Sequence, residues 1–266
     1  MNSGRRFSVI FDDEHLVVVD KGPGVLTVPT AKRETNTLVQ MLRQHLGRGR
    51  RYAPRLEVVH RLDREVSGVL VFAKTAAAAE RLRADFAAHR PEREYAALVA
   101  GNLPAADGTF ASRLVTGKGL QRFSSRDGET GEAAVTHYRV ERRLAGATLV
   151  CVRLETGRRN QIRVHFAEAG HPILGEKRYR PEQARHRSWR GERLALHARL
   201  LAFAHPVTGA ALRFESPLPR EFDAFVREAG QAAPADPNRH DRAADTAPRR
   251  PGTAPRGRRS RPGATR

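Results

Sequence analysis

The chain reads HRLDREVSGVLVFAK from His60 to Lys74, and this stretch decides both the fold and the candidate site. Its residues 69–72 are an unbroken run of β-branched, aliphatic and aromatic side chains, which predicts a strand. A serine and Gly68 come just before the run, and the glycine relieves the backbone where the strand begins. Asp63 lies ahead of them, two residues from the cationic Arg61. An aspartate at such a position is either a turn residue or a reactive carboxylate.

Outward from this stretch, the pattern mixes strands with helices. Short β-branched-rich runs predict strands around Ile10 and at residues 16–19, 95–99 and 149–154. Apolar residues at helical spacing predict helices at 38–46, 76–88 and 161–169. Thr75 is the expected N-cap of the second helix, Asn160 that of the third, and Gly170 the stop of the third. Strands and helices do not alternate regularly, so an α+β domain is favoured over a doubly wound sheet.

The 266 residues divide by composition into two parts. Residues 1–230 hold enough apolar side chains for one folded domain. Residues 231–266 contain no Leu, Ile, Val or aromatic residue, but nine arginines and three aspartates. Such a segment cannot bury enough apolar area to offset the entropy of ordering it. It is predicted to be a disordered basic tail, either an RNA-binding arm or a solvated extension.

The composition also bears on the cellular location of the protein and on whether it can form disulfides. The chain has no apolar run of about 18 residues that would span a membrane. Residues 1–11 lack the apolar core of a signal peptide, so a cytoplasmic location is expected. A single cysteine, Cys151, excludes an intrachain disulfide and a cysteine-rich zinc site.

The charge favours a nucleic-acid partner. Lys and Arg number 48 against 29 Asp and Glu, which leaves a formal net charge of +19. The arginine fork binds phosphate in a bidentate manner and stacks on bases. A genome that favours arginine codons, together with the basic tail, is the alternative explanation. Charge alone therefore suggests nucleic acid without specifying RNA.

Several other chemistries lack their sequence patterns. The residues at 60–63 do not have the order of a kinase H-R-D loop, and no phosphate-binding G-x-G-x-x-G accompanies them. Ser67 does not lie in a G-x-S-x-G motif, so a serine hydrolase has no support. The eleven histidines lack H-E-x-x-H or any other spacing of metal ligands, so no metal site is predicted.

Two further stretches carry candidate site residues. Residues 156–165 read TGRRNQIRVH and place three arginines around a helix start. A carboxylate that faces a buried guanidinium stays ionised and fixed in orientation, as a catalytic Asp63 would need. Residues 93–101 read REYAALVAG, where Tyr95 is either a core strand residue or a platform for a base.

Together these stretches resemble the motifs of the RluA-type pseudouridine synthases. The resemblance includes weaker matches at residues 20–26 and 194–206, in the order of the family, and covers roughly residues 7–228. It implies a mixed, mostly antiparallel bent sheet flanked by helices and loops. The family often has an S4-type module before the catalytic domain, which is expected to be absent here. Asn160 and Glu176 replace the family's usual histidine and aspartate, and neither is given a role in the chemistry.

The resemblance implies an isomerase that converts uridine to pseudouridine in RNA without a cofactor or metal. The base would be extruded into a pocket, at the cost of unstacking it. Asp63 would attack the ribose C1′ or abstract a ribose proton, and the sequence leaves both routes open. The expected catalytic residues are Asp63, Arg163 and Tyr95, and the expected substrate-binding residues are Arg61, His60, Leu196, Arg158 and Gln161.

The resemblance does not specify a single RNA substrate or a single binding partner. The family acts on ribosomal and transfer RNA, so an rRNA or tRNA stem-loop is expected, with the enzyme a monomer that needs no protein partner. The alternative is a noncatalytic RNA-binding or RNA-folding protein that retains the fold and does not need Asp63. A weaker alternative is a DNA-binding role for the tail, which salt-dependent binding without preference for RNA would indicate.

Overall fold

The computed structural model describes residues 6–31, 33–49, 51, 54–191 and 193–231, which belong to one compact unit, Met1–Ala233. The described strands are β1 (Phe7–Asp12), β2 (Leu16–Lys21), β3 (Glu57–Val58), β4 (Ser67–Ala73), β5 (Glu92–Ala100), β6 (Asp107–Thr116), β7 (Arg122–Ser124), β8 (Glu132–Leu144), β9 (Ala147–Leu154), β10 (Leu196–Ala204) and β11 (Ala211–Glu215). The helices are α1 (Leu38–Leu46), α2 (Ala76–Ala87), α3 (Gln161–Glu168), α4 (Arg220–Gln231) and the short 3-10 helix η1 (Lys118–Leu120). The predicted tail lies outside the described residues, except for residue 231 at the end of α4.

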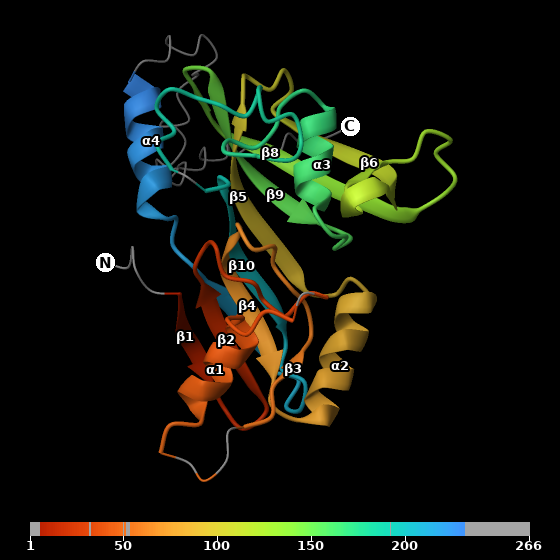
Figure 1. Cartoon of the computed structure of the whole chain (residues 1–266), viewed down its shortest axis with the longest axis vertical. Helices are drawn as coiled ribbons and strands as arrows, with labels where there is room; N and C mark the ends of the chain where they lie inside the picture. Colours follow the sequence, from red (N-terminus) through yellow and green to blue (C-terminus); the bar gives the residue numbers. More distant parts are fainter. Residues whose placement is uncertain (1–5, 32, 50, 52–53, 192, 232–266) are drawn as a thin grey trace, which may run out of the picture. The chain divides into compact units, whose positions relative to one another are not determined.

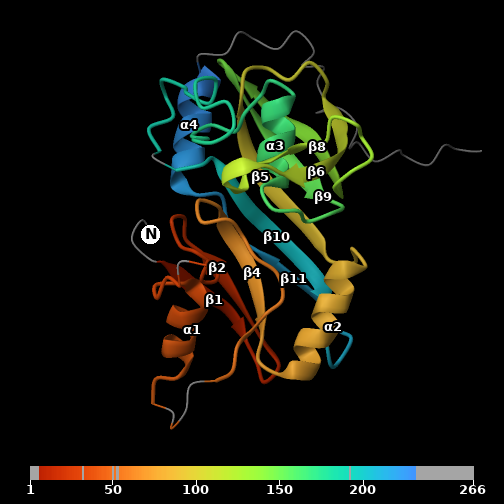
Figure 2. The same ribbon diagram turned by 45° about the vertical axis from the view of Figure 1, so that its right-hand side comes forward.

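All described strands join one sheet. Its order is β1-β2-β4-β10-β5-β9-β8-β6-β7, with β3 paired to β4 and β11 paired to β10. Only the β4–β10 pair is parallel among the described pairs. Helices α1 and α2 lie at the end of the sheet that holds β1, β2 and β4, and α3 and α4 lie at the end that holds β8 and β9 (Figure 1; Figure 2). The predicted α+β class with a mixed, mainly antiparallel sheet is confirmed.

Strand β4 lies in the interior, with all seven of its residues buried. Leu70 and Phe72 pack into the larger hydrophobic core, and the alternate residues Val69 and Val71 pack into a second core with α2. A strand covered on both faces needs apolar side chains at every position, because successive side chains point to opposite faces. The apolar run at residues 69–72 is unbroken because both faces of β4 are buried.

Gly68 lets β4 approach β10. Its φ is +117°, and a Cβ atom built on it would lie 2.0 Å from the carbonyl oxygen of Ala198. Only glycine combines this backbone conformation with the absence of a side chain. This close approach occurs where the two strands pair, with Gly68 opposite Ala198 and the preceding Ser67 opposite His197. The glycine that precedes the apolar run is therefore required for β4 to pair with β10.

Replacing Gly68 with alanine is expected to lower the free energy of unfolding by about 3–5 kcal/mol, the sum of backbone strain and overpacking. Gly128 is a matched control, because its φ is +70° but a Cβ there would meet nothing within 4 Å. Gly128→Ala should therefore cost only about 1 kcal/mol of left-handed strain. Urea unfolding of both variants measures the difference, and equal losses would rule out the close approach as the cause.

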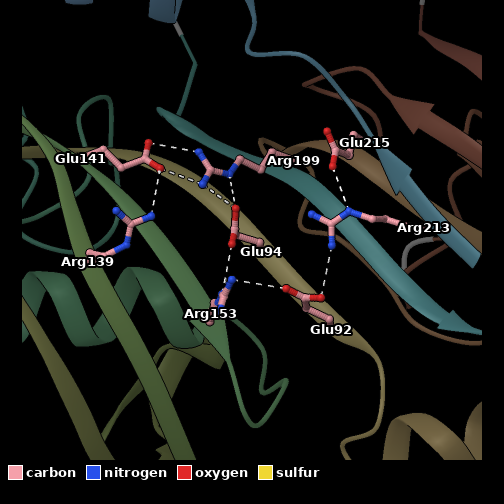
Figure 3. A network of polar contacts seen from close by, with 8 residues as sticks. All are labelled: Glu92, Glu94, Arg139, Glu141, Arg153, Arg199, Arg213 and Glu215. Atoms are coloured by element: carbon pink, nitrogen blue, oxygen red, sulfur yellow. Dashed lines mark hydrogen bonds and ion pairs between the residues drawn. The ribbon is translucent and has the colours of Figure 1, made fainter. Parts of the chain in front are cut away.

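The face of the sheet opposite Tyr95 carries a network of ion pairs (Figure 3). Glu94 is at its centre and contacts Arg199 at 2.5 Å and Arg153 at 3.1 Å. Glu94 and Tyr95 are neighbours on β5, so their side chains point to opposite faces. The full set is Glu92, Glu94, Arg139, Glu141, Arg153, Arg199, Arg213 and Glu215. Four arginines are thus matched by four glutamates, so this network adds nothing to the protein's net positive charge.

The three helices predicted from the sequence are present in the structure, whereas α4 was not predicted. Helix α1 has the predicted bounds, and α2 and α3 each end one residue earlier than predicted. The Thr75 side chain accepts a hydrogen bond from the Ala78 N–H at 3.2 Å, so the predicted N-cap of α2 is confirmed. Asn160 occupies the predicted N-cap position of α3, but its side chain makes no capping hydrogen bond to that helix. Asn160 points elsewhere, into the candidate site.

Candidate active site

The turn that carries Asp63 is held from both sides. It lies between β3 and β4, and a hydrogen bond from the Val66 N–H to the Asp63 carbonyl at 3.2 Å closes it. The buried Thr27 hydroxyl donates to the Leu62 carbonyl at 2.8 Å and accepts from the Leu62 N–H at 3.3 Å. On the other side, the Lys21 ammonium donates to the backbone of the next residue in the turn. The carboxylate therefore sits on a rigid support, although no helix or strand contains it.

Lys21 is a buried cation that ties three backbone segments together. Its side chain is fully buried, and Nζ donates to the carbonyls of Gly22 at 3.0 Å, Val25 at 2.8 Å and Arg64 at 3.2 Å. Burial lowers the pKa of Lys21 to about 7, because the charged ammonium loses its water. It lies near enough to Asp63 for attraction between their charges to oppose this shift.

Lys21→Met is expected to lower the free energy of unfolding by about 1–3 kcal/mol, since it leaves buried carbonyls without a donor. The folded-state pKa of about 7 lies below the ordinary value of 10.5. Between these values the unfolded chain binds more protons, so the wild type gains stability as the pH rises through the interval. The advantage of wild type over the variant in urea unfolding should therefore be larger at pH ~9.5 than at pH ~6.5. An advantage that shrinks would mean that folding favours the charged ammonium.

A cavity of about 140 Å³ opens beside the turn. Two of its walls come from adjacent strands, Tyr95 on β5 and Leu196 on β10, which lie along one face because Tyr95 pairs with Ala198. The remaining walls come from the turn and from the start of α3. The lining residues are Arg61, Leu62, Asp63, Val66, Tyr95, Gly157, Arg158, Arg159, Asn160, Gln161, Ile162, Arg163 and Leu196. Four arginines therefore surround one candidate carboxylate in a partly apolar cavity.

Asp63 faces Arg163 across this cavity. Arg163 Nη1 lies 3.4 Å from Asp63 Oδ2 and 3.7 Å from a carboxylate oxygen of Glu65. Burial raises the pKa of Asp63, and the Arg163 guanidinium opposes that effect by favouring the ionised carboxylate. Asp63 is therefore a carboxylate with less solvation than an exposed aspartate and one oriented cationic neighbour.

Arg163 is itself held by a buried carboxylate. Its Nε and Nη2 each lie 2.7 Å from one oxygen of Glu176, whose side chain is completely buried. Burial alone would raise the pKa of Glu176, but the hydrogen bonds and charge of Arg163 outweigh it and lower that pKa. The bidentate pair fixes the plane of the guanidinium and leaves only Nη1 for Asp63.

The other predicted residues differ in how they reach the cavity. Arg61 is exposed and lines it, and Arg158 lines it while paired with Glu132 at 3.2 Å. Gln161 also lines it, but its amide is fully used by hydrogen bonds to residues 135, 136, 156 and 158. Its position supports the start of α3, and the structure leaves no free amide group for a substrate.

His60 is the predicted residue that the structure does not bring to the cavity. Its ring stacks on Phe86 of α2 with centroids 4.4 Å apart, and Nε2 accepts a hydrogen bond from the Val71 N–H at 3.2 Å. Burial lowers the pKa of His60 to about 3, so the ring is neutral. These contacts join the turn to α2 and β4, and the structure offers no support for His60 as a substrate contact.

Three side chains at the site were not expected from the sequence. Glu176 holds Arg163, Asn160 lies beside Asp63, and the Tyr179 hydroxyl contacts Asn160. In the sequence, Asn160 and Glu176 were departures from the family pattern and neither had an expected role in the chemistry, although Asn160 was expected to cap α3. The sequence shows that these residues are near Arg163 along the chain, but it does not show where their side chains point.

The arrangement is typical of a carboxylate-dependent enzyme with a phosphate-rich substrate. A poorly solvated carboxylate held by a guanidinium can act as nucleophile or general base. Arginines at the rim suit a polyanion, and the tyrosine and leucine walls suit a planar ring. Among the described residues, no group of three or more His, Cys, Asp or Glu side chains is arranged to hold a metal ion.

Comparisons with known proteins identify the family. The profile described as RNA pseudouridylate synthase matches residues 15–168. Ribosomal large subunit pseudouridine synthase D of Zymomonas mobilis is 39% identical over 227 residues, covering 82% of this chain and 71% of the relative. The protein of the same name from Pseudomonas aeruginosa is 37% identical over 223 residues, covering 80% and 69%. The chain belongs to the RNA pseudouridylate synthase family and is an RNA uridine-to-pseudouridine isomerase.

Solved structures agree on the fold. Human RNA Pseudouridylate Synthase Domain Containing 4 superposes with a TM-score of 0.69 at 22% identity, covering 84% of this chain and 92% of that one. Human RNA Pseudouridylate Synthase Domain Containing 1 gives a TM-score of 0.66 at 23% identity, covering 88% of this chain and 99% of that one.

The described part of the chain holds no helix long and apolar enough to cross a membrane.

Proposed function

We propose that this enzyme isomerises uridine in large-subunit ribosomal RNA and that Asp63 is its catalytic carboxylate. The observation that carries the assignment is the partly buried Asp63 carboxylate, held by Arg163, in a cavity lined by four arginines. The names of the bacterial relatives, ribosomal large subunit pseudouridine synthase D, support ribosomal RNA over transfer RNA. Retention of the aspartate, the arginine and the tyrosine together disfavours a noncatalytic RNA-binding protein.

The chemistry needs one bond broken and one formed. The N1–C1′ bond of uridine breaks, the uracil turns, and C5 joins C1′. The hydrogen on C5 leaves to solvent as a proton, and N1 takes up a proton. The carboxylate of Asp63 either attacks C1′, forming and then releasing an ester-like bond, or removes a ribose proton and later returns one. Both routes are redox-neutral.

The cavity walls have distinct tasks in this proposal. The uridine leaves its helix, and Tyr95 stacks on the extruded base while Leu196 closes the pocket. Burial raises the pKa of Tyr95, so its phenol stays protonated and can hydrogen-bond to the base. Arg61 and Arg158 contact phosphates at the rim, because both line the cavity and are only partly engaged in the protein.

Tritium release tests the activity and the substrate together. Unmodified transcripts of large-subunit rRNA and of a tRNA mixture, with uridine tritiated at C5, are incubated with the full chain. Release from the rRNA and not from the tRNA is expected. Release from tRNA alone would contradict the proposed substrate, and release from neither, with both RNAs bound, would favour the noncatalytic alternative.

Three finer expectations belong to this proposal. The enzyme is expected to act as a monomer in the cytoplasm and to need no protein partner. Light scattering on the full chain, with and without the rRNA transcript, measures the number of chains per complex. A stable dimer would contradict the monomer.

A further inference from the structure

Asn160 has a backbone conformation that is uncommon for most residues. Its φ and ψ are +57° and +17°, in the left-handed region, immediately before the first residue of α3. Asparagine tolerates this region better than most side chains. Asn160 is 9% exposed, and its side chain does not cap the helix that it precedes. The conformation instead turns the amide toward the Asp63 turn.

The hydrogen-bonding partners determine how this amide is oriented. One end of it faces the Asp63 carboxylate, and the other faces the Tyr179 hydroxyl. An ionised carboxylate only accepts hydrogen bonds, so the NH2 group must be the end that faces it. Nδ2 then lies 2.7 Å from Asp63 Oδ2 and 3.3 Å from Oδ1, and Asn160 Oδ1 accepts from Tyr179 Oη at 2.9 Å.

Tyr179 holds the amide in that orientation. It is 6% exposed, and its hydroxyl oxygen accepts a hydrogen bond from the Arg122 N–H at 3.2 Å. The hydroxyl keeps its own proton, which it donates to Asn160 Oδ1 once the amide NH2 faces the carboxylate. The Arg163 guanidinium also lies over the Tyr179 ring, 5.6 Å from its centroid. A chain of donors therefore runs from the β7 backbone through Tyr179 and Asn160 to Asp63.

We propose that Asn160 is a positioning residue, the neutral donor that fixes and stabilises the reactive carboxylate of Asp63. At 2.7 Å, its contact is shorter than the 3.4 Å contact from Arg163, two of whose nitrogens are engaged by Glu176. Arg163 thus supplies charge, and Asn160 supplies the direct hydrogen bond. The inference rests on the proposed function, because it requires Asp63 to be the catalytic group.

The other charged and titratable groups around Asp63 come from several elements. Arg163 faces it from α3, Lys21 from β2 and Tyr95 from β5, and Glu65 and Arg61 belong to its own turn. Asn160 adds a contact without adding a charge. A carboxylate at the same position would instead be a like charge at hydrogen-bonding distance, which favours protonation of one member of the pair.

Two variants separate the amide from the backbone conformation. Asn160→Asp keeps the shape and replaces the NH2 donor with an oxygen. Asn160→Gly keeps the left-handed backbone and removes the side chain. Both residues tolerate the region, so both variants are expected to fold. The control is Asn102→Asp, the same change at an exposed position that does not line the cavity.

The readout is the pH dependence of single-turnover tritium release. For Asn160→Asp we expect the acidic limb of the rate profile to move up by at least about one pH unit. For Asn160→Gly we expect a rate constant about 10- to 100-fold lower, with RNA affinity changed less than about threefold, since a lost hydrogen bond to a charge is worth about 1.5–3 kcal/mol. Asn102→Asp should match the wild type in both.

The outcomes separate this inference from the proposed function. Wild-type rates for Asn160→Gly, or an unmoved acidic limb for Asn160→Asp, would overturn the positioning role. If Asp63→Asn is inactive while the Asn160 variants behave as wild type, only this inference fails. If Asp63→Asn stays active, the proposed function fails with it. Should Asn160→Gly unfold, the shape-preserving Asn160→Asp alone decides.

Discussion

Asp63→Asn is expected to reduce tritium release from the rRNA transcript by about 10⁴-fold or more, the scale of losing a catalytic nucleophile or base. An amide has nearly the same shape as the carboxylate but neither attacks C1′ nor removes a proton. The fold should be unchanged, because the turn is held through backbone groups by Thr27 and Lys21. Single-turnover assays with the enzyme in excess over RNA measure the chemical step.

Binding provides the control within the same experiment. Asp63 is a negative charge in a cavity lined by four arginines, so its removal should leave RNA affinity equal or slightly higher. Asp107→Asn is the matched variant, since Asp107 is exposed at the start of β6 and does not line the cavity. An Asp63→Asn protein that binds RNA and still releases tritium would contradict the assigned mechanism.

Arg163→Met is expected to lower the free energy of unfolding by about 3–5 kcal/mol and to abolish measurable turnover. The change leaves Glu176 as a buried carboxylate without its bidentate partner, and it removes the cation that faces Asp63. Burial would then raise the pKa of Glu176, so the stability deficit should shrink as the pH falls and the carboxyl group takes up a proton. Urea unfolding at several pH values measures this deficit.

A second substitution separates stability from catalysis. In the double variant Arg163→Met/Glu176→Gln, the uncompensated charge at position 176 is gone, so much of the lost stability should return. Activity should not return, because Asp63 still lacks its guanidinium. Recovery of both in the double variant would mean that Arg163 serves the fold alone, and recovery of neither would mean that the Glu176 charge is not the source of the destabilisation.

The sequence was informative wherever a local pattern has one physical cause. The apolar run of β4 predicted a strand, and the spacing of the α2 residues predicted a helix, because both patterns depend on side chains close together in the chain. By contrast, β3, β6, β7, β8, β10, β11 and α4 were not predicted. The run of β10 mixes apolar and polar residues, since its Arg199 joins the ion network while its other face packs in the core.

The residues expected at the candidate site also include some that the structure brings there and one that it does not. Asp63, Arg163, Tyr95 and Leu196 were all expected at one site from the sequence, and the structure brings them around one cavity. His60 was also expected there, but the strand that follows it orients its ring toward Phe86. Stacking against a helix depends on where α2 packs, which no spacing within residues 60–74 reveals.

The sequence by itself determined the chemical groups available to this protein: one carboxylate in a tight turn, the arginines around it, and a tyrosine on a neighbouring strand. Tertiary structure decided which of these groups are engaged and by what. Asn160 reads as a helix cap, yet its left-handed backbone turns the amide to Asp63, and Glu176 occupies two of the nitrogens of Arg163. A hydrogen bond requires an atom-to-atom distance near 3 Å with the correct orientation, and only the packed fold sets both for residues far apart in the chain.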